Sequence, residues 1–222
     1  MIKGVILVNY RPVYADFRCK GNNLEMKIRA YILIVLVLAL LAGTQVRADS
    51  ASSREYQIKA AFLYNFIMFV DWPQGKITDG NEPLVISIIG KDPFEGAFEP
   101  IKDKLINGRK VVIKRFEGFE ELRKSGARLN QAIEDIKKCH LLFICRSEGK
   151  VVSQIVDLVK DSSVLTVGDM PKFLETGGGI INFVMEEEKV RFEINAVAAN
   201  QVGLQIRSQL LRLAKRVIEA KK

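Results

Sequence analysis

The sequence predicts an α/β fold in which helices cover both faces of a mainly parallel sheet. Short, continuous apolar runs recur along the chain, as in strands that are buried on both faces. The segments between them carry apolar residues at helical spacing. Strands that alternate with helices favour a parallel sheet, so we expect Rossmann-like layering. An acidic turn between the last two runs indicates a C-terminal antiparallel hairpin, and a long terminal helix is expected after it.

The segment 26–48 has the organisation of a cleavable secretory signal peptide. Lys27 and Arg29 form a short basic region, and an uncharged run rich in Leu, Ile and Val follows over 30–43. A membrane anchor is the alternative interpretation. A spanning helix needs about 17–25 apolar residues, and this run is shorter, so the cleaved peptide is favoured.

The organisation of the chain follows from this signal. Ala48 and Asp49 flank the expected cleavage site, because small or apolar residues stand at the positions that a signal peptidase recognises. Since a signal peptide begins at its own methionine, Met26 is the expected start, and residues 1–25 are interpreted as a non-native extension. Residues 49–222 are then a single domain of ordinary length. We therefore expect the working protein to be periplasmic.

Removal of residues 1–48 changes the charge of the chain. That segment holds seven of the 34 basic residues and two of the 26 acidic ones, so the net charge falls from +8 to +3. The basic character of the whole chain is therefore no argument for nucleic-acid binding. Two cysteines remain, Cys139 and Cys145. They flank the apolar run 141–144. If this run is a strand, the two sulfurs lie too far apart along it to pair with each other, so two half-buried free thiols are the favoured interpretation. An intermolecular disulfide is the alternative in an oxidising compartment.

The first element expected after the signal is a helix over 55–70. It is apolar nearly all round; beyond Lys59, only Asn65 interrupts the apolar surface. Such a helix must be covered on more than one side. The domain core is the favoured cover, and a second subunit or a partner is the alternative. The helix should stop before Pro73, because proline disfavours helix in the residue that precedes it.

The remaining elements follow from apolar runs and periodicity. The expected strands are 84–89, 110–116, 140–145, 163–167, 180–185 and 190–194. The expected helices are 120–138, 147–160, a short one at 170–175, and the long terminal helix 196–220.

The residues offer no catalytic or metal-binding constellation, so we expect no catalytic residue, no cofactor and no metal. The only histidine, His140, begins a buried strand and is interpreted as structural. Cys139 and Cys145 lack the spacing that brings metal ligands together. The run Gly177–Gly179 precedes a strand rather than a helix, which argues against a phosphate loop. It predicts a tight turn or a close approach of the backbone to another group.

Two further features of the sequence could take part in ligand binding. The segment Gly90–Phe94 follows a strand and is expected to open a helix with Asp92 as its N-cap, where backbone N–H groups could hold an anion. A plain turn is the simpler interpretation. Arg191 and Glu193 share one face of a strand, where they could pair with each other or face a ligand.

Several short stretches, in order, resemble the YfiR family of periplasmic proteins. They cover nearly all of residues 49–222, and the ordered set is more specific than any one of them. The stretches are 55–66, 69–73, 90–94, 107–109, 139–144, 165–169, 177–183 and 191–195.

The resemblance implies a regulator rather than an enzyme. It implies a protein that restrains a membrane-bound diguanylate cyclase by binding its periplasmic part, that an outer-membrane lipoprotein can sequester, and that can form a homodimer. The family's redox-linked disulfides do not carry over, because two cysteines cannot form two disulfides. The contact surface expected from the resemblance consists of Gly177, Gly178, Gly179, Asn182, Arg191 and Asn195.

A periplasmic binding module for a small anion or metabolite is the alternative function. Its site would lie at the carboxyl ends of the parallel strands, near 90–94 and 168–169, because open α/β sheets hold their ligands there.

Overall fold

The computed structural model describes the backbone of residues 22–77 and 82–220. Within the first helix it describes the side chains of residues 27–33 and from residue 51 onward. The chain divides into two units between Asp49 and Ser50, and the second unit holds the sheet. The expected cleavage site at Ala48 and Asp49 lies outside the described side chains, as does the whole extension 1–25, so both stay predictions.

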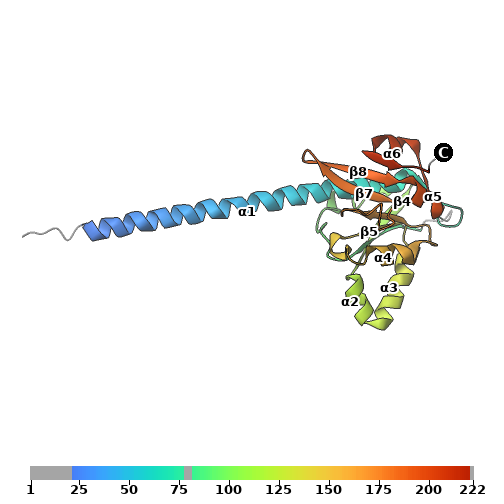
Figure 1. Ribbon diagram of the computed structural model, residues 1–222, viewed down its shortest axis with the longest axis horizontal. Helices are drawn as coiled ribbons and strands as arrows, with labels where there is room; N and C mark the ends of the chain where they lie inside the picture. The colour runs from blue at the N-terminus through green and yellow to red at the C-terminus, as the bar shows by residue number, and fades with distance from the viewer. Residues whose placement is uncertain (1–21, 78–81, 221–222) are drawn as a thin grey trace, which may run out of the picture. The chain divides into compact units, whose positions relative to one another are not determined.

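The first helix, α1, spans Asn22–Met68 (Figure 1). The helix expected over 55–70 forms its last part, and β1 (Val70–Asp71) follows it. No helix among the described residues is both long enough and apolar enough to cross a membrane.

An eight-stranded sheet forms the centre of the second unit. Its strands run in the order β10-β8-β7-β6-β5-β2-β4-β3. Pairing is parallel from β7 through β6, β5 and β2 to β4, and again between β10 and β8, but antiparallel at β7–β8 and β3–β4. The sheet as a whole is therefore mixed, which corrects the expectation of a mainly parallel one. The bounds are β2 Leu84–Ile89, β3 Leu105–Ile106, β4 Arg109–Phe116, β5 Leu141–Ile144, β6 Leu165–Gly168, β7 Ile181–Glu186, β8 Lys189–Asn195 and β10 Arg216–Ile218.

The C-terminal hairpin is confirmed as β7 and β8. Glu187 and Glu188 form its two-residue turn with φ of 48° and 60°, the backbone that suits a tight hairpin. The hairpin does not end the sheet, however, because β10 adds to the outer side of β8.

The long terminal helix expected over 196–220 is wrong. The chain instead forms α5 (Ala196–Gln201), β9 (Gln205–Ile206), α6 (Ser208–Leu213) and β10. Gly203 follows α5 with φ of 76°, a left-handed conformation that commonly ends a helix. The strands β9 and β10 then find partners in β1 and β8. Helical spacing of the apolar residues did not reveal these distant pairings.

Other helices are shorter than expected. The segment 120–138 is divided at Ser125 into α2 (Phe119–Lys124) and α3 (Gly126–Lys138). Within 147–160 only α4 (Val152–Val159) is α-helical; the 3-10 turn η2 (Arg146–Glu148) precedes it. A second 3-10 turn, η1, spans Glu99–Ile101, and 170–175 forms turns rather than a helix.

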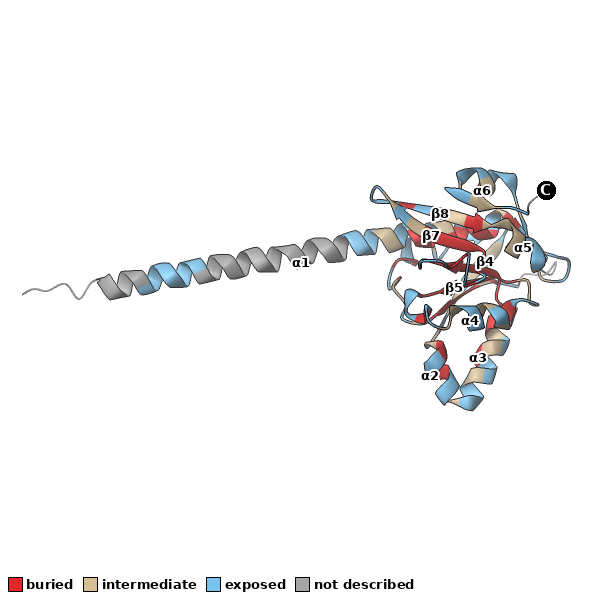
Figure 2. Ribbon diagram, viewed as in Figure 1, coloured by how far each residue is buried: buried red, intermediate tan, exposed pale blue. Residues whose placement is uncertain are grey.

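The hydrophobic core lies in two clusters that share the sheet (Figure 2). Along β5, Leu141 and Phe143 belong to the first cluster, and Leu142 and Ile144 belong to the second. Because successive side chains of a strand point to opposite faces, the clusters lie on opposite sides of the sheet. The last part of α1 packs into the first cluster, and α3 and α4 pack into the second.

Candidate functional site

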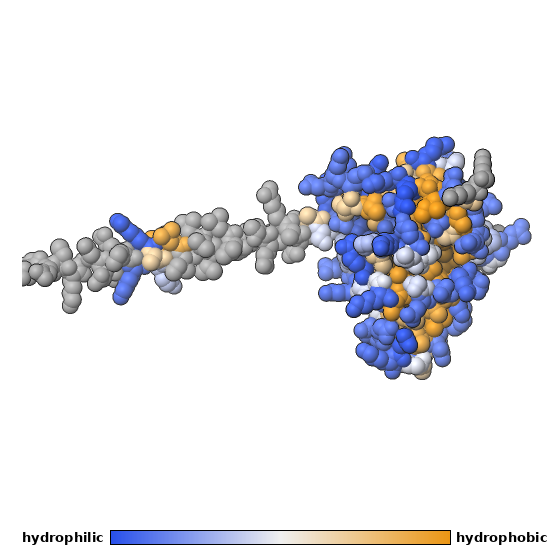
Figure 3. Space-filling view, viewed as in Figure 1, coloured by the Kyte–Doolittle hydropathy of each residue, from blue (hydrophilic) through white to orange (hydrophobic). Residues whose placement is uncertain are grey.

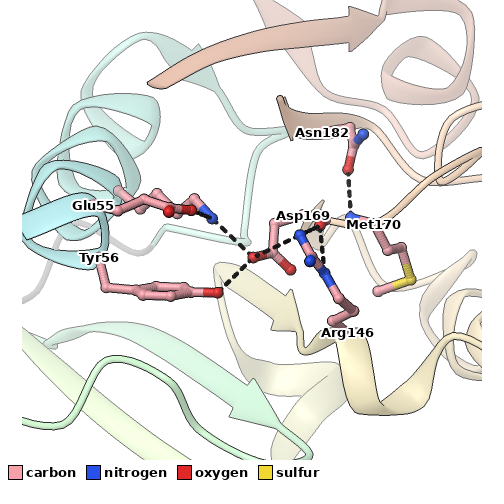
Figure 4. A network of polar contacts seen from close by, with 7 residues as sticks. Glu55, Tyr56, Arg146, Asp169, Met170 and Asn182 are labelled. Carbon is pink, nitrogen blue, oxygen red and sulfur yellow. Dashed lines mark hydrogen bonds and ion pairs between the residues drawn. The ribbon is translucent and has the colours of Figure 1, made fainter. Parts of the chain in front are cut away.

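A buried polar network joins α1 to the carboxyl ends of β5 and β6 (Figure 4). Asp169 directly follows β6, and its side chain is 2% exposed. Its Oδ2 accepts a hydrogen bond from Lys59 Nζ at 2.9 Å and another from the Tyr56 hydroxyl at 2.8 Å. Both donors belong to α1, so one carboxylate oxygen anchors two successive turns of that helix.

Lys59 is as deeply buried as its partner. Its Nζ also pairs with Glu55 Oε1 at 2.5 Å, one helical turn earlier, and lies 4.3 Å from the centre of the Tyr56 ring. Two carboxylates, those of Asp169 and Glu55, thus compensate the charge of the Lys59 ammonium group. Loss of such a partner would be costly, because the charge would stay unpaired in a low-dielectric interior.

The backbone around Asp169 is held as firmly as its side chain. Arg146, which begins η2, donates two hydrogen bonds to the Asp169 carbonyl oxygen, at 2.8 and 3.2 Å. The next residue, Met170, donates its backbone N–H to Asn182 Oδ1 at 3.2 Å. The loop after β6 is thus fixed from β5 on one side and from β7 on the other.

The electrostatics of the network favour a hydrogen bond that the Tyr56 hydroxyl donates to the Asp169 carboxylate. Burial and the Asp169 charge both raise the pKa of the Tyr56 hydroxyl, so it remains protonated and donates. The second oxygen of the carboxylate, Oδ1, is buried and has no hydrogen-bond partner among the described residues. The charged centre of the network, Lys59 with Asp169, is buried, and it docks α1 on the sheet.

The glycine run lies closest to Phe173, with Val152 and Val156 of α4 beside it. A Cβ on Gly179 would lie 2.0 Å from the Phe173 ring, and one on Gly177 would lie 2.7 Å from the Phe173 carbonyl oxygen. Gly178 has φ of 70°. The expectation of a tight turn with close backbone approach is confirmed, and Phe173 is the group that the backbone approaches.

The other residues of the expected contact surface are placed differently. Asn182 is buried, and Asn195 caps α5 by accepting a hydrogen bond from the Ala198 N–H at 3.0 Å. Asn195 Nδ2 also donates to the Leu174 carbonyl at 3.3 Å, which ties it to the segment before the glycines. Arg191 lies apart on the hairpin, half exposed, with Glu186 at 3.6 Å. The structure thus brings Asn195 close to the glycine segment and leaves Arg191 at a distance along β8.

The paired charges on β8 differ from the simplest expectation. Glu193 does not pair with Arg191; Arg216 of β10 donates to it at 2.6 Å and to Glu175 at 2.5 Å. Arg216 could not be identified as the partner in advance because it was expected in the terminal helix.

His140 has the buried environment expected of it, whereas the two cysteines, which were expected to be half-buried, are fully buried. Cys139 and Cys145 are free and buried, and burial raises the pKa of the Cys139 thiol to about 12. His140 is 8% exposed, and its Nδ1 accepts a hydrogen bond from the Val85 N–H at 3.1 Å. No cluster of ligating side chains suited to a metal ion occurs among the described residues.

We expect His140 to make folding stability fall with acid. Burial, helped by Lys76 and Arg109, lowers its pKa from about 6.5 to about 4, so the folded state holds it neutral. Below pH 6.5 the unfolded chain takes up a proton that the folded chain refuses. The free energy of unfolding should therefore drop by about 2 kcal/mol between pH 7 and pH 5. Urea unfolding at both values measures this. His140→Asn keeps an acceptor for Val85 and should show a correspondingly smaller drop; an equal drop would contradict the assignment.

The carboxyl ends of β2, β4 and β5 border an open hollow of about 570 Å³. Its wall includes Gly90 with φ of 100° and the buried Glu148, which accepts the Phe119 N–H at 2.9 Å. Asp92 does not cap a helix as expected; it accepts the Phe94 N–H within a turn and pairs with Arg115. The lining of the hollow carries both signs of charge, with Glu117, Glu120 and Glu121 beside Lys91 and Lys150, so it shows no clear preference for an anion. At the carboxyl end of β6, near 168–169, the expected ligand position is occupied by the Tyr56 and Lys59 side chains of α1.

Sequence reasoning missed the roles of Tyr56, Lys59, Arg146 and Asp169. Lys59 was the available signal, because a single charge on an otherwise apolar helix face needs a buried partner. Nothing in the sequence indicated which carboxylate that partner would be, since Asp169 lies 110 residues away.

The fold and the network together define an α/β domain whose first helix is docked on the sheet by a buried ion pair. The chain belongs to the YfiR/HmsC-like family, whose model matches residues 56–215. The matched range begins at Tyr56, so it contains most of the network.

Comparison with curated proteins gives no match. Among solved structures, the chain is similar to a conserved domain protein from Vibrio cholerae O1 biovar El Tor, with 12% identity and a TM-score of 0.43 over 60% of this chain and 54% of that one. It is also similar to the ABC domain in complex with L-Trp from Streptococcus pneumoniae, with 13% identity and a TM-score of 0.45 over 61% of this chain and 55% of that one. The chain thus spans about half the length of each of these structures.

Proposed function

We propose that this protein is a periplasmic regulator that binds and restrains a membrane-bound signalling enzyme, namely a diguanylate cyclase. Membership of the YfiR/HmsC-like family over residues 56–215 carries this proposal. The matched range lies within the unit Ser50–Lys222. The expected signal peptide would deliver that unit to the periplasm. An outer-membrane lipoprotein that sequesters the protein, and a homodimer, are further partners that the proposal includes.

The distribution of polar and apolar groups supports a binding role. The most deeply buried charges, Lys59 and Asp169, are consumed in docking α1. The visible face of the Ser50–Lys222 unit carries hydrophobic patches among charged side chains (Figure 3). Met185 and Leu213 are large apolar residues that are about half exposed or more, at 48% and 60%. Single exposed apolar residues are common on protein surfaces, but contiguous apolar patches with a polar rim, such as those in Figure 3, are typical of interaction surfaces.

Within the proposed contact surface, we assign different roles to its members. Arg191 is exposed enough to meet a partner directly. Asn182 and Asn195 would act indirectly, because their amides are engaged within the fold. The glycine run would keep the shape of the turn that is presented beside them.

Deletion of the gene in its host should raise cellular cyclic-di-GMP and biofilm formation, because the cyclase would lose its restraint. Quantifying cyclic-di-GMP in extracts of the deletion strain, with and without the gene restored on a plasmid, measures this. An Arg191→Glu copy should restore repression less well than the natural gene at equal protein level. Unchanged cyclic-di-GMP after deletion, under conditions in which the cyclase is expressed, would contradict the proposal.

Binding of a small molecule is a second candidate function. The hollow at the carboxyl ends of β2, β4 and β5 favours it, because ligands of open α/β sheets bind at this edge. A thermal-shift screen of cationic and anionic metabolites tests it, and the absence of stabilisation by every compound would count against it.

A further inference from the structure

The outer edge of β4 is open over most of its length. The short strand β3 pairs only with Arg109 and Lys110. From Val111 to Phe116, β4 pairs with β2 on one side, and no other strand in the described part of the chain pairs with its opposite side. A long unpaired edge is unusual, because it leaves a row of backbone donors and acceptors available to another chain.

The backbone groups on this edge can be identified. Hydrogen bonding alternates along a strand, so successive residues point their N–H and C=O groups to opposite sides. The Phe116 carbonyl accepts the Gly90 N–H on the β2 side. The groups of Val111, Ile113 and Arg115 therefore point outward. Among the described residues, none of these three has a backbone partner on that side.

The β3–β4 hairpin, to which this edge belongs, carries an excess of positive charge. Residues 102–115 contain six basic residues and one acidic residue, a net charge of +5, whereas the rest of the chain after the expected cleavage site has a net charge of −2. Lys114 and Arg115 each pair with a carboxylate. Lys104 and Lys110 are exposed, and their side chains have no partner among the described residues. The open edge is thus bordered by uncompensated cations.

We propose that an extended acidic segment of a partner protein adds to the sheet as a strand along β4. Main-chain hydrogen bonds to Val111, Ile113 and Arg115 would supply affinity, as in other cases of strand addition. Lys104 and Lys110 would select acidic side chains on the added strand. The inference rests on the proposed function only for the idea that a partner protein exists; the edge itself follows from the sheet.

A second copy of this chain is the less suitable occupant. Pairing two β4 edges would bring the basic residues of both copies together, and like charges that face each other across strands are destabilising. Cations on an edge also protect a protein against aggregation. Both effects have one cause: basic residues along the β4 edge repel a second, identical edge and attract a strand with acidic side chains. An anionic lipid surface could meet the lysines, but it offers no ladder of alternating donors and acceptors to the backbone.

Titration of the purified, isotope-labelled full chain with two synthetic octapeptides tests this inference. One peptide alternates Glu and Val, and the matched control alternates Lys and Val, both with blocked ends. Addition of the Glu peptide should shift the amide resonances of Val111, Ile113 and Arg115 and slow their hydrogen exchange. The Lys peptide should leave them unchanged. A Lys104→Glu, Lys110→Glu double variant should bind the Glu peptide about tenfold more weakly, which corresponds to about 1.4 kcal/mol.

The matched control is a Lys124→Glu, Lys160→Glu double variant. It changes the net charge equally at two exposed positions on α2 and after α4, and it should bind the Glu peptide like the natural protein. Three results would overturn the inference: no shift of the β4 amides at millimolar peptide, equal binding of both peptides, or equal weakening in both double variants. These results concern the edge alone, because the cyclic-di-GMP level of the deletion strain tests the proposed function independently.

Discussion

Replacement of Lys59 by methionine should lower the free energy of unfolding by about 3–5 kcal/mol. Methionine fills a similar volume, so the packing of α1 changes little. The change instead leaves the Asp169 carboxylate buried, with Oδ1 unpaired, a hydrogen bond from Tyr56 to Oδ2, and the largely exposed Arg146 guanidinium 4.0 Å away as its remaining cation. A buried charge without its partner is among the costliest single defects a fold can carry. Urea unfolding followed by circular dichroism measures the change.

The matched control is Lys102→Met. Lys102 pairs with Glu99 at 2.6 Å, but both side chains are more than half exposed, at 57% and 68%. Exposed ion pairs contribute about 0–1 kcal/mol, so this variant should unfold almost like the natural protein. Combination of Lys59→Met with Asp169→Leu removes both charges and should recover much of the stability. If Lys59→Met and Lys102→Met were equally mild, or if the combined variant were simply additive, Lys59 and Asp169 would not be coupled as described.

The second large effect is expected for Gly179→Ala, which should destabilise the fold by about 3 kcal/mol. The added methyl group would lie 2.0–2.4 Å from three atoms of the Phe173 ring. Phe173 is 1% exposed and packs in the second hydrophobic cluster, so the ring cannot turn away without displacing its neighbours. Differential scanning calorimetry should show a lower unfolding temperature.

Two companion variants isolate the cause. A Cβ on Gly126, at the start of α3, meets no atom within 4 Å. Gly126→Ala should therefore be neutral or stabilise the fold by up to about 1 kcal/mol. Addition of Phe173→Leu to Gly179→Ala removes part of the ring that obstructs the methyl group and should cost less than the two single changes together. A Gly179→Ala protein as stable as the natural one would show that the close approach to Phe173 is not rigid.

Much of the fold could be predicted from local pattern. The apolar runs of β2, β5 and β6 have strand length and flanking polar residues, so their assignment did not depend on distant partners. The hairpin β7–β8 was predictable for the same reason, because its turn lies between the two strands it joins. The helix before Pro73 was predicted from its periodicity, although it ends at Met68 and the last predicted residue, Val70, begins a short strand. His140 was predicted to begin a buried strand because an apolar run follows it, but the same pattern predicted thiols that are only half-buried, and the assembled sheet covers them fully.

The candidate site could be predicted only in outline. Lys59 was visible as a lone charge on an apolar helix, but its partner Asp169 comes from a loop after β6 that only the assembled sheet brings into contact. Similarly, Phe173 explains the glycine run, yet no periodicity connects a ring to a turn that folds back over it. Local pattern therefore indicated only Lys59 and the glycine run, and neither the other residues of the site nor the pairings between them.

The sequence by itself determined the α/β class, the positions of the central strands and the family resemblance, because each depends on short-range periodicity or on ordered local motifs. Tertiary structure alone decided the fate of the last 25 residues, where Gly203 ends a helix and two short strands find partners in β1 and β8. It also decided the Lys59–Asp169 anchor and the open edge of β4. The physical reason is the same in each case: a backbone or charged group is satisfied by whichever partner the whole fold brings near, and sequence distance carries no record of that choice.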